Sequence, residues 1–139
     1  MDKPVISDNS ISIPASLKYL TDVDEFVEGF LRRHGAEESA IADIAISVSE
    51  LINNAVAHGS ASLPEQPIVV TIDRTDGLIK IGVSDPGSGF DPDSIDDPLA
   101  DENLLKEAGR GIFIVRSLMD SVVIETSGRG TTVIITKQL

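Results

Sequence analysis

A glutamate and an asparagine one helical turn apart are the first residues in the chain that point to chemistry. Glu50 and Asn54 lie four positions apart in a segment of helical periodicity, so their side chains share one face. Asparagine is unfavourable inside a helix, and Asn53 and Asn54 stand there side by side. An amide oxygen is a suitable ligand for Mg²⁺, and a carboxylate nearby can deprotonate a nucleophile. Taken alone, however, the pair favours an ordinary solvated helix face.

Two glycine-rich segments follow, at positions where a base or a phosphate can approach the backbone. Asp85 comes directly after a β-type run, where a carboxylate can accept a hydrogen bond from an exocyclic amine, and Gly87 and Gly89 leave room for a planar ring. Gly109 and Gly111 precede an apolar helical segment, whose first N–H groups can bind phosphate. Each segment alone is also compatible with a simple turn or hinge. The segment at Gly109 and Gly111 lacks the spacing of a Walker A loop, and it is not a dinucleotide fingerprint because it follows an acidic loop rather than a strand.

A last motif, Gly130-Thr131-Thr132, opens the final β-type run. Two threonines are common strand formers, so this motif carries little weight by itself. The order of the set is more informative than any member. E-x-x-x-N on a helix is followed by D-x-G-x-G after a strand, a long loop, G-x-G before a helix and G-T before a strand.

The elements that must position these motifs follow from hydrophobic periodicity. Asp76-Gly77 between two β-branched runs predicts a tight hairpin. We expect a strand, two helices, two strands, a long loop, a third helix and two final strands, at residues 10–14, 14–34, 37–58, 68–72, 78–83, 85–102, 112–119, 122–126 and 131–136. This grouping predicts an α+β fold, a two-layer sandwich with helices on one face of a mixed, largely antiparallel sheet.

The helix over residues 37–58 should bury an apolar stripe and present a polar one on the opposite side. The apolar stripe comprises Ile41, Ile44, Ala45, Val48, Leu51, Ile52, Ala55 and Val56. The polar stripe comprises Ser47, Glu50, Asn54 and His58.

The composition narrows the class of protein. The 139 residues suit one domain, and with 41% hydrophobic but only 4% aromatic residues the core must be aliphatic. The absence of cysteine excludes disulfides and cysteine-ligated zinc. A net charge of −12 argues against nucleic-acid binding. No apolar run reaches the length of a membrane span and the N-terminus lacks a signal-peptide core, so we expect a soluble, cytoplasmic protein.

The ordered motifs resemble the GHKL ATPase family, which includes histidine kinases, MutL, type II topoisomerase subunits and a heat-shock chaperone. The resemblance covers nearly the whole chain and is most specific over residues 49–59 and 109–120, which look like the stand-alone anti-sigma factor serine kinases of bacteria. It implies a Bergerat-type ATP-binding fold, with a single domain at residues 1–139 and an ATP lid at residues 90–108.

The resemblance also implies roles for individual residues. Glu50 matches the general base and Asn54 the Mg²⁺ ligand. Asp85 matches the carboxylate that binds the adenine amino group, with Gly87 and Gly89 lining the base.

Further positions match the phosphate-binding part of the family site. Gly109 and Gly111 match the phosphate-binding glycines, and Thr131 matches a hydroxyl near the adenine. The lid is acidic and has no basic residue before Lys106, which departs from what a triphosphate needs. Lys106 and Arg110 are therefore the expected phosphate contacts.

These features predict a serine/threonine kinase that binds Mg-ATP, sequesters a sigma factor and phosphorylates an anti-anti-sigma protein. Two alternatives remain open: a nucleotide-dependent binding module without kinase activity, and a detached histidine-kinase catalytic domain. The chain has only His34 and His58, and neither lies in a preceding dimerisation hairpin. Relatives of this type commonly dimerise through their N-terminal region, so we also expect a homodimer.

Overall fold

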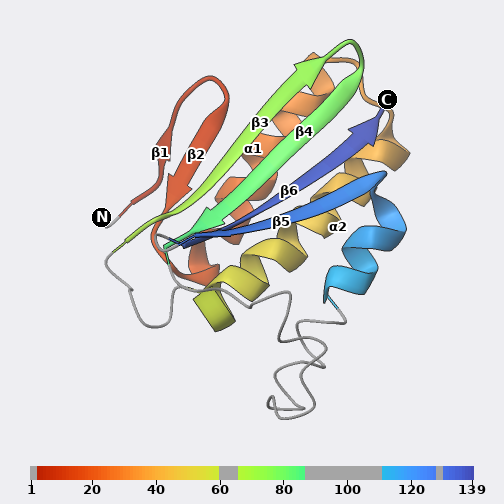
Figure 1. The fold of residues 1–139 in the computed structure, drawn as a ribbon. Helices are drawn as coiled ribbons and strands as arrows, with labels where there is room; N and C mark the ends of the chain where they lie inside the picture. Colours follow the sequence, from red (N-terminus) through yellow and green to blue (C-terminus); the bar gives the residue numbers. More distant parts are fainter. Residues whose placement is uncertain (1–2, 60–65, 87–110, 128–129) are drawn as a thin grey trace.

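A six-stranded sheet forms one layer of the molecule and the helices cover one of its faces (Figure 1). The structure, a computed structural model, describes residues 3–59, 66–86, 111–127 and 130–139. The strand order is β1-β2-β3-β4-β6-β5, and each of the five pairings is antiparallel. The predicted α+β class is confirmed, and the sheet over the described residues has no parallel pair.

The elements follow the predicted order, with one short addition at the N-terminus. The strands are β1 Val5–Ile6, β2 Ser10–Ile13, β3 Ile68–Thr75, β4 Leu78–Asp85, β5 Ser121–Ser127 and β6 Gly130–Gln138. The helices are a 3₁₀ turn at Leu17–Tyr19, α1 Leu20–Arg33, α2 Glu38–Asn54, a π-helical continuation at Ala55–Gly59, and a helix over residues 111–118. Strand β1 was not predicted.

Local chemistry fixes the ends of α1. The helix does not begin at Pro14 as predicted, because the Ser16 hydroxyl accepts the Lys18 N–H at 3.2 Å and starts the 3₁₀ turn instead. At the other end Gly35 has φ 77°, and the Ala36 N–H donates to the Leu31 carbonyl at 3.0 Å. This is the Schellman arrangement that a C′ glycine favours.

The β3–β4 hairpin confirms the turn that Asp76-Gly77 predicts. Both residues have positive φ, 51° and 84°, as a two-residue type I′ turn requires. The turn pairs Thr75 with Leu78 and sets a register that ends with Ser84 opposite Val69. Strand β4 then carries Asp85 at its last position.

The core lies between the helices and the sheet and is almost entirely aliphatic. Its largest fully buried side chains are Ile11, Ile13, Leu31, Ile44, Ile52, Ile68, Ile72, Ile79, Ile81, Ile135, Val23 and Val27. By length and composition the stretch Glu38–Ala57 could cross a membrane. Its apolar stripe, however, belongs to this core, and a core helix passes the same test of length and hydropathy.

Candidate functional site

One stripe of α2 carries the site residues, and it is more buried than the sequence predicted. Asp43, Ser47, Glu50 and Asn54 recur every three to four positions. Ser47 is fully buried and its hydroxyl donates to the Asp43 carbonyl at 2.9 Å, whereas Ile46 is 47% exposed. The prediction that the polar stripe lies opposite the core is therefore wrong at Ser47, which tertiary packing buries.

Gly111 brings two of the predicted motifs into contact. A Cβ atom on Gly111 would lie 3.2 Å from Glu50 Oε2, 3.2 Å from Asn54 Nδ2 and 3.4 Å from Asn54 Oδ1. The first turn of the helix over residues 111–118 thus lies directly on the Glu50–Asn54 pair. The N–H groups in the first turn of a helix have no partner within the helix and carry partial positive charge, so a helix that begins near Gly111 presents such groups at the Glu50–Asn54 pair.

The Asn54 side chain has an unsatisfied polar atom. Among the described residues, Asn54 Nδ2 is buried and has no hydrogen-bond partner. Leaving a buried polar group unpaired costs about 1–3 kcal/mol, which is unusual unless the group has a function. Rotation of the amide by a half turn exchanges its oxygen and nitrogen, so the same position can present an oxygen.

The donor set fits a magnesium ion that is held mainly by a substrate. Mg²⁺ usually takes one or two protein oxygens together with phosphate oxygens and water. The Asn54 amide supplies one such atom, and the Glu50 carboxylate lies beside it. The described residues contain no cluster of three or more acidic, histidine or cysteine side chains, so a self-sufficient protein cage is not present there.

The other side of Asn54 faces a small cavity between α2 and the end of the sheet. Its walls are Leu51, Asn54, Ala55, Val83, Asp85, Thr131 and Val133. Asp85 and Thr131 are paired across β4 and β6, and Thr131 is only 3% exposed. The structure therefore brings Asn54, Asp85 and Thr131 together, as the motif order predicts.

This cavity is narrow. It measures about 10 Å³, which is room for a single water molecule and far less than a purine needs. Entry of a base therefore requires its walls to separate. The π-helical stretch Ala55–Gly59 begins at this wall, and such irregular turns are frequent at functional sites.

Several predicted residues lie outside the described part of the chain. These are Gly87, Gly89, Lys106, Gly109, Arg110 and the segment 90–108 that the resemblance identifies as a lid. Their predicted roles stay predictions.

A polar contact that the sequence did not indicate connects α1 to the site helix. The Ser49 hydroxyl donates to Asp24 Oδ1 at 3.4 Å, one position before Glu50. Burial raises the pKa of the Asp24 carboxyl; the Ser49 hydrogen bond opposes this shift and the charge of Glu28 adds to it. Sequence spacing could not have revealed this contact, because Asp24 and Ser49 are 25 positions apart and belong to different helices.

Comparison with known proteins gives the same family from sequence and structure. The family model described as histidine kinase-like ATPase domain matches residues 13–137. The serine-protein kinase RsbW of Staphylococcus aureus (strain MRSA252) is 33% identical over 134 residues, which cover 91% of this chain and 84% of that protein. RsbW of strain JH9 gives the same values.

Solved structures agree. The RsbU and RsbW domains of a Mycobacterium tuberculosis protein match with a TM-score of 0.71 and 26% identity over 99% of this chain, which spans 33% of that longer chain. The histidine kinase domain of a blue-light-activated kinase from Erythrobacter litoralis matches in fold, with a TM-score of 0.59, 22% identity, and coverage of 91% of this chain and 62% of that one. With the family model spanning nearly all of its length, the chain belongs to the histidine kinase-like ATPase domain family.

Proposed function

We propose that this protein is an ATP-dependent serine/threonine protein kinase. The observation that carries the proposal is the close approach of Gly111 to both Glu50 and Asn54, while Asn54 also lines the cavity that ends at Asp85 and Thr131. This proximity supports a single site in which we assign base-reading, metal-binding and proton-accepting roles to these groups. The relatives named serine-protein kinase RsbW support the choice of reaction.

The roles follow from the position of each group. Asp85 and Thr131 bind the adenine end of the nucleotide, and Asn54 holds Mg²⁺, which neutralises charge on the phosphates when bound. The N–H groups at Gly111 bind phosphate oxygens. Glu50 accepts the proton of a serine hydroxyl while that oxygen bonds to the γ-phosphorus and the bond to the β,γ-bridging oxygen breaks, which releases ADP.

The acceptor and the regulated partner belong to this proposal as well. The protein phosphorylates an anti-anti-sigma protein and sequesters a sigma factor, and it works in the cytoplasm. Support comes from the RsbW relatives and from the match of residues 49–59 and 109–120 to that group of kinases.

A transfer experiment tests the function. Purified protein is incubated with γ-labelled ATP, Mg²⁺ and a candidate anti-anti-sigma protein. We expect label on a serine or threonine of the acceptor, and Glu50→Gln should abolish transfer while ATP still binds. Glu37→Gln is the matched control, because Glu37 is exposed and its side chain makes no capping hydrogen bond. Transfer at the wild-type rate by Glu50→Gln would refute the role of Glu50.

The binding-module alternative predicts a different result in the same experiment. ATP would bind and affect the sigma-factor complex, but no label would reach any acceptor. The histidine-kinase alternative finds less support, because the His34 ring donates from Nδ1 to the Phe30 carbonyl at 2.8 Å and stacks on the Phe30 ring, with the ring centroids 4.1 Å apart. An acid-labile phosphohistidine on the protein would favour that alternative.

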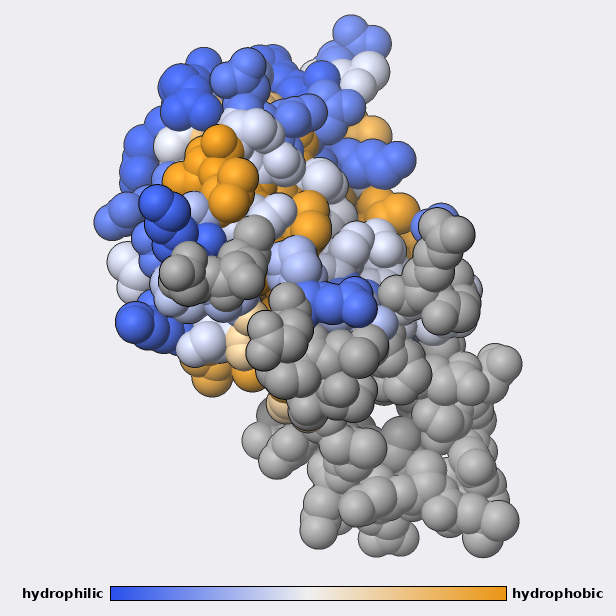
Figure 2. Space-filling model, turned by 90° about the vertical axis from the view of Figure 1, so that its left-hand side faces the viewer, coloured by the Kyte–Doolittle hydropathy of each residue, from blue (hydrophilic) through white to orange (hydrophobic). Residues whose placement is uncertain are grey.

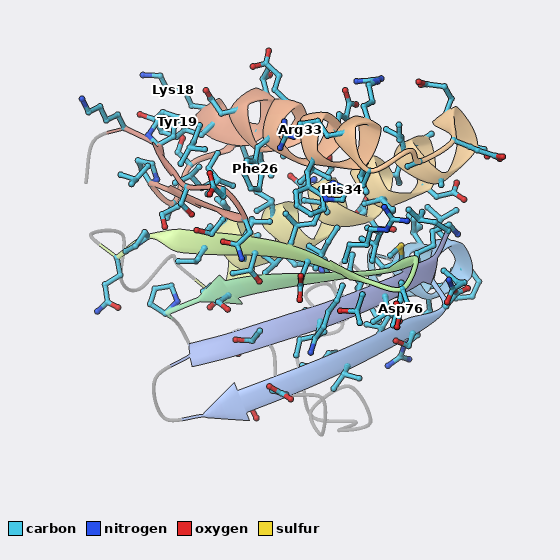
Figure 3. All side chains as sticks on the ribbon, turned by 90° about the horizontal axis from the view of Figure 1, so that it is seen from above. Lys18, Tyr19, Phe26, Arg33, His34 and Asp76 are labelled. Carbon is cyan, nitrogen blue, oxygen red and sulfur yellow. The ribbon has the colours of Figure 1, made fainter. Side chains whose placement is uncertain are left out.

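A groove along α1 suits the expected second subunit. It has a volume of about 1000 Å³ and is lined by Ile6, Ser7, Asp8, Asn9, Asp22, Glu25, Phe26, Phe30, Arg33 and His34. The side chains of Phe26 and His34 lie on the side of α1 that faces the sheet (Figure 3). On the β1–β2 side of the molecule, apolar patches interrupt a mostly hydrophilic surface (Figure 2). Val5 and Ile6 of β1 are 57% and 61% exposed.

The charged residues of this groove are arranged so that they could pair in a dimer with two-fold symmetry. Asp22 and Glu25 lie in the first half of α1 and Arg33 at its end, so two antiparallel copies of α1 place opposite charges together. We expect a dimer in sedimentation analysis, a shift to monomer in Arg33→Glu, and recovery of the dimer when Asp22→Lys is added. A wild-type monomer would contradict this assignment without affecting the kinase proposal.

A further inference from the structure

The helix over residues 111–118 is held at its C-terminal end by a lysine from the last strand. Lys137 Nζ donates to the Leu118 carbonyl at 2.7 Å, and Leu118 is the last helical residue. The final carbonyls of a helix lack partners inside the helix and carry partial negative charge, so an ammonium group stabilises them. The Lys137 side chain is only 19% exposed, which limits screening by water.

The same ammonium group connects that helix to α2. Lys137 Nζ lies 3.5 Å from Asp43 Oδ2. Asp43 belongs to the stripe that continues through Ser47 to Glu50 and Asn54, and Ser47 is bonded to the Asp43 carbonyl. Eleven positions separate Asp43 from Asn54, which is about 16 Å along a helix axis.

The helix over residues 111–118 is therefore fixed at both ends against one face of α2. Gly111, the first residue of this helix that the structure describes, lies close to Glu50 and Asn54, and the last helical residue, Leu118, is tied to Asp43 through Lys137. Two further hydrogen bonds join the residues after it to β6: the Asp120 N–H to the Thr136 carbonyl at 2.9 Å, and the Gln138 N–H to Asp120 Oδ2 at 2.6 Å. Eight residues of helix span only about 12 Å, so a displacement of one end moves the other.

We propose that Lys137 is a positioning residue for the nucleotide phosphates. It holds the C-terminal end of the helix over residues 111–118 and thereby sets the distance between the N–H groups at Gly111 and the Glu50–Asn54 pair. This inference rests on the proposed function, since it assumes that phosphates bind at Gly111. Lys137 itself lies six positions along β6 from Thr131, which is about 20 Å, so it does not touch the bound nucleotide.

The position of Lys137 predicts which ligands should depend on it. Loss of the lysine should weaken ligands that reach the Gly111 N–H groups and spare those that occupy only the cavity at Asp85 and Thr131. A lysine with a merely structural role would weaken adenosine, ADP and ATP by the same factor. The dependence on the number of phosphates is therefore the decisive readout.

Titration calorimetry tests this prediction. It measures the affinities of adenosine, ADP and Mg-ATP for the wild type, Lys137→Met, Lys137→Arg and Lys80→Met. We expect Lys137→Met to weaken ATP about tenfold and adenosine less than twofold, on the scale of one charge-assisted hydrogen bond. Lys137→Arg should recover most of the ATP affinity, because arginine also donates to the Leu118 carbonyl. Lys80→Met is the matched control, since Lys80 is exposed on β4 and pairs with Thr136 on the open face of the sheet.

The outcomes separate the inference from the function beneath it. Wild-type protein that does not bind ATP would refute the proposed function. Suppose that the wild-type protein binds ATP. If Lys137→Met then binds all three ligands with wild-type affinity, or loses the same factor of affinity for each of them, only the role of Lys137 is refuted. If Lys137→Met does not fold, Asp43→Asn keeps the bond to Leu118 while it removes the ion pair. Asp43→Asn should then show a smaller loss with the same dependence on phosphates, and an equal loss for adenosine would overturn the inference.

Discussion

Replacing Gly111 by alanine tests whether the first turn of the helix over residues 111–118 must touch the Glu50–Asn54 pair. The new Cβ would lie 3.2 Å from Glu50 Oε2 and from Asn54 Nδ2. Ordinary van der Waals contact is about 3.5–4.0 Å, so the helix end must move away by a few tenths of an ångström. Alanine gains about 0.5–1 kcal/mol over glycine in a helix, which offsets this strain. We therefore expect the free energy of unfolding to change by less than about 1 kcal/mol.

The effect on ATP should be much larger than the effect on stability. In the proposed site the N–H groups at Gly111 donate to the phosphates, and fixed donors of this kind lose strength steeply when they are displaced. We expect ATP affinity to fall about tenfold, which corresponds to about 1.4 kcal/mol. Titration calorimetry measures the affinity and thermal unfolding checks the fold.

Gly29→Ala is the control for Gly111→Ala. Gly29 also lies in a helix, α1, but its new Cβ would meet only the end of the Arg33 side chain at an ordinary 3.4 Å. That variant should be slightly stabilised and bind ATP as the wild type does. If Gly111→Ala also binds ATP as the wild type does, the contact between this helix and the Glu50–Asn54 pair has no part in nucleotide binding, and the reasoning is refuted.

Three further substitutions test separate parts of the account. Asn54→Ala should remove Mg²⁺-dependent nucleotide binding. Its melting temperature should be unchanged or higher, because the substitution also removes a buried unpaired amide. A large loss of stability on thermal unfolding would contradict the statement that this amide is unpaired. Asp24 has a raised pKa in the folded state, so its contribution to stability is complete below the ordinary value of 3.8 and is lost as the pH rises through the raised pKa. Asp24→Asn should therefore melt progressively higher than the wild type as the pH rises from about 3 to 7, and parallel curves would argue against the burial of that carboxyl. Gly130 has φ 144°, and a Cβ there would collide with the Asp85 carbonyl. Gly130→Ala should therefore lower the free energy of unfolding, measured in urea, by more than about 2 kcal/mol. An unfolding midpoint equal to that of the wild type would show that the β4–β6 pairing at Asp85 is not as tight as described.

Features set by neighbouring residues were the ones that sequence reasoning predicted well. Asp76 and Gly77 both tolerate positive φ, which determines their turn without reference to the rest of the fold. Gly35 ends α1 for a similar reason. The shared face of Glu50 and Asn54 follows from helix geometry alone.

Features set by tertiary contact were not predictable from spacing. Ser47 is small and polar, which suggests a solvated position, yet tertiary packing buries it completely. The contact of Lys137 with Asp43 and Leu118 joins three elements that are distant in the chain. The motif order indicated which residues meet around Asn54, but the width of the cavity between Asp85 and Leu51 depends on how α2 sits on the sheet.

The central claim is that the site around Glu50, Asn54 and Gly111 binds Mg-ATP, and equilibrium binding of ATP with Mg²⁺ and with a chelator tests it most directly. The account predicts saturable binding of one ATP per chain that weakens when Mg²⁺ is removed, with the dependence on Mg²⁺ absent in Asn54→Ala. If wild-type protein that is shown to be folded binds no ATP under either condition, the account is contradicted.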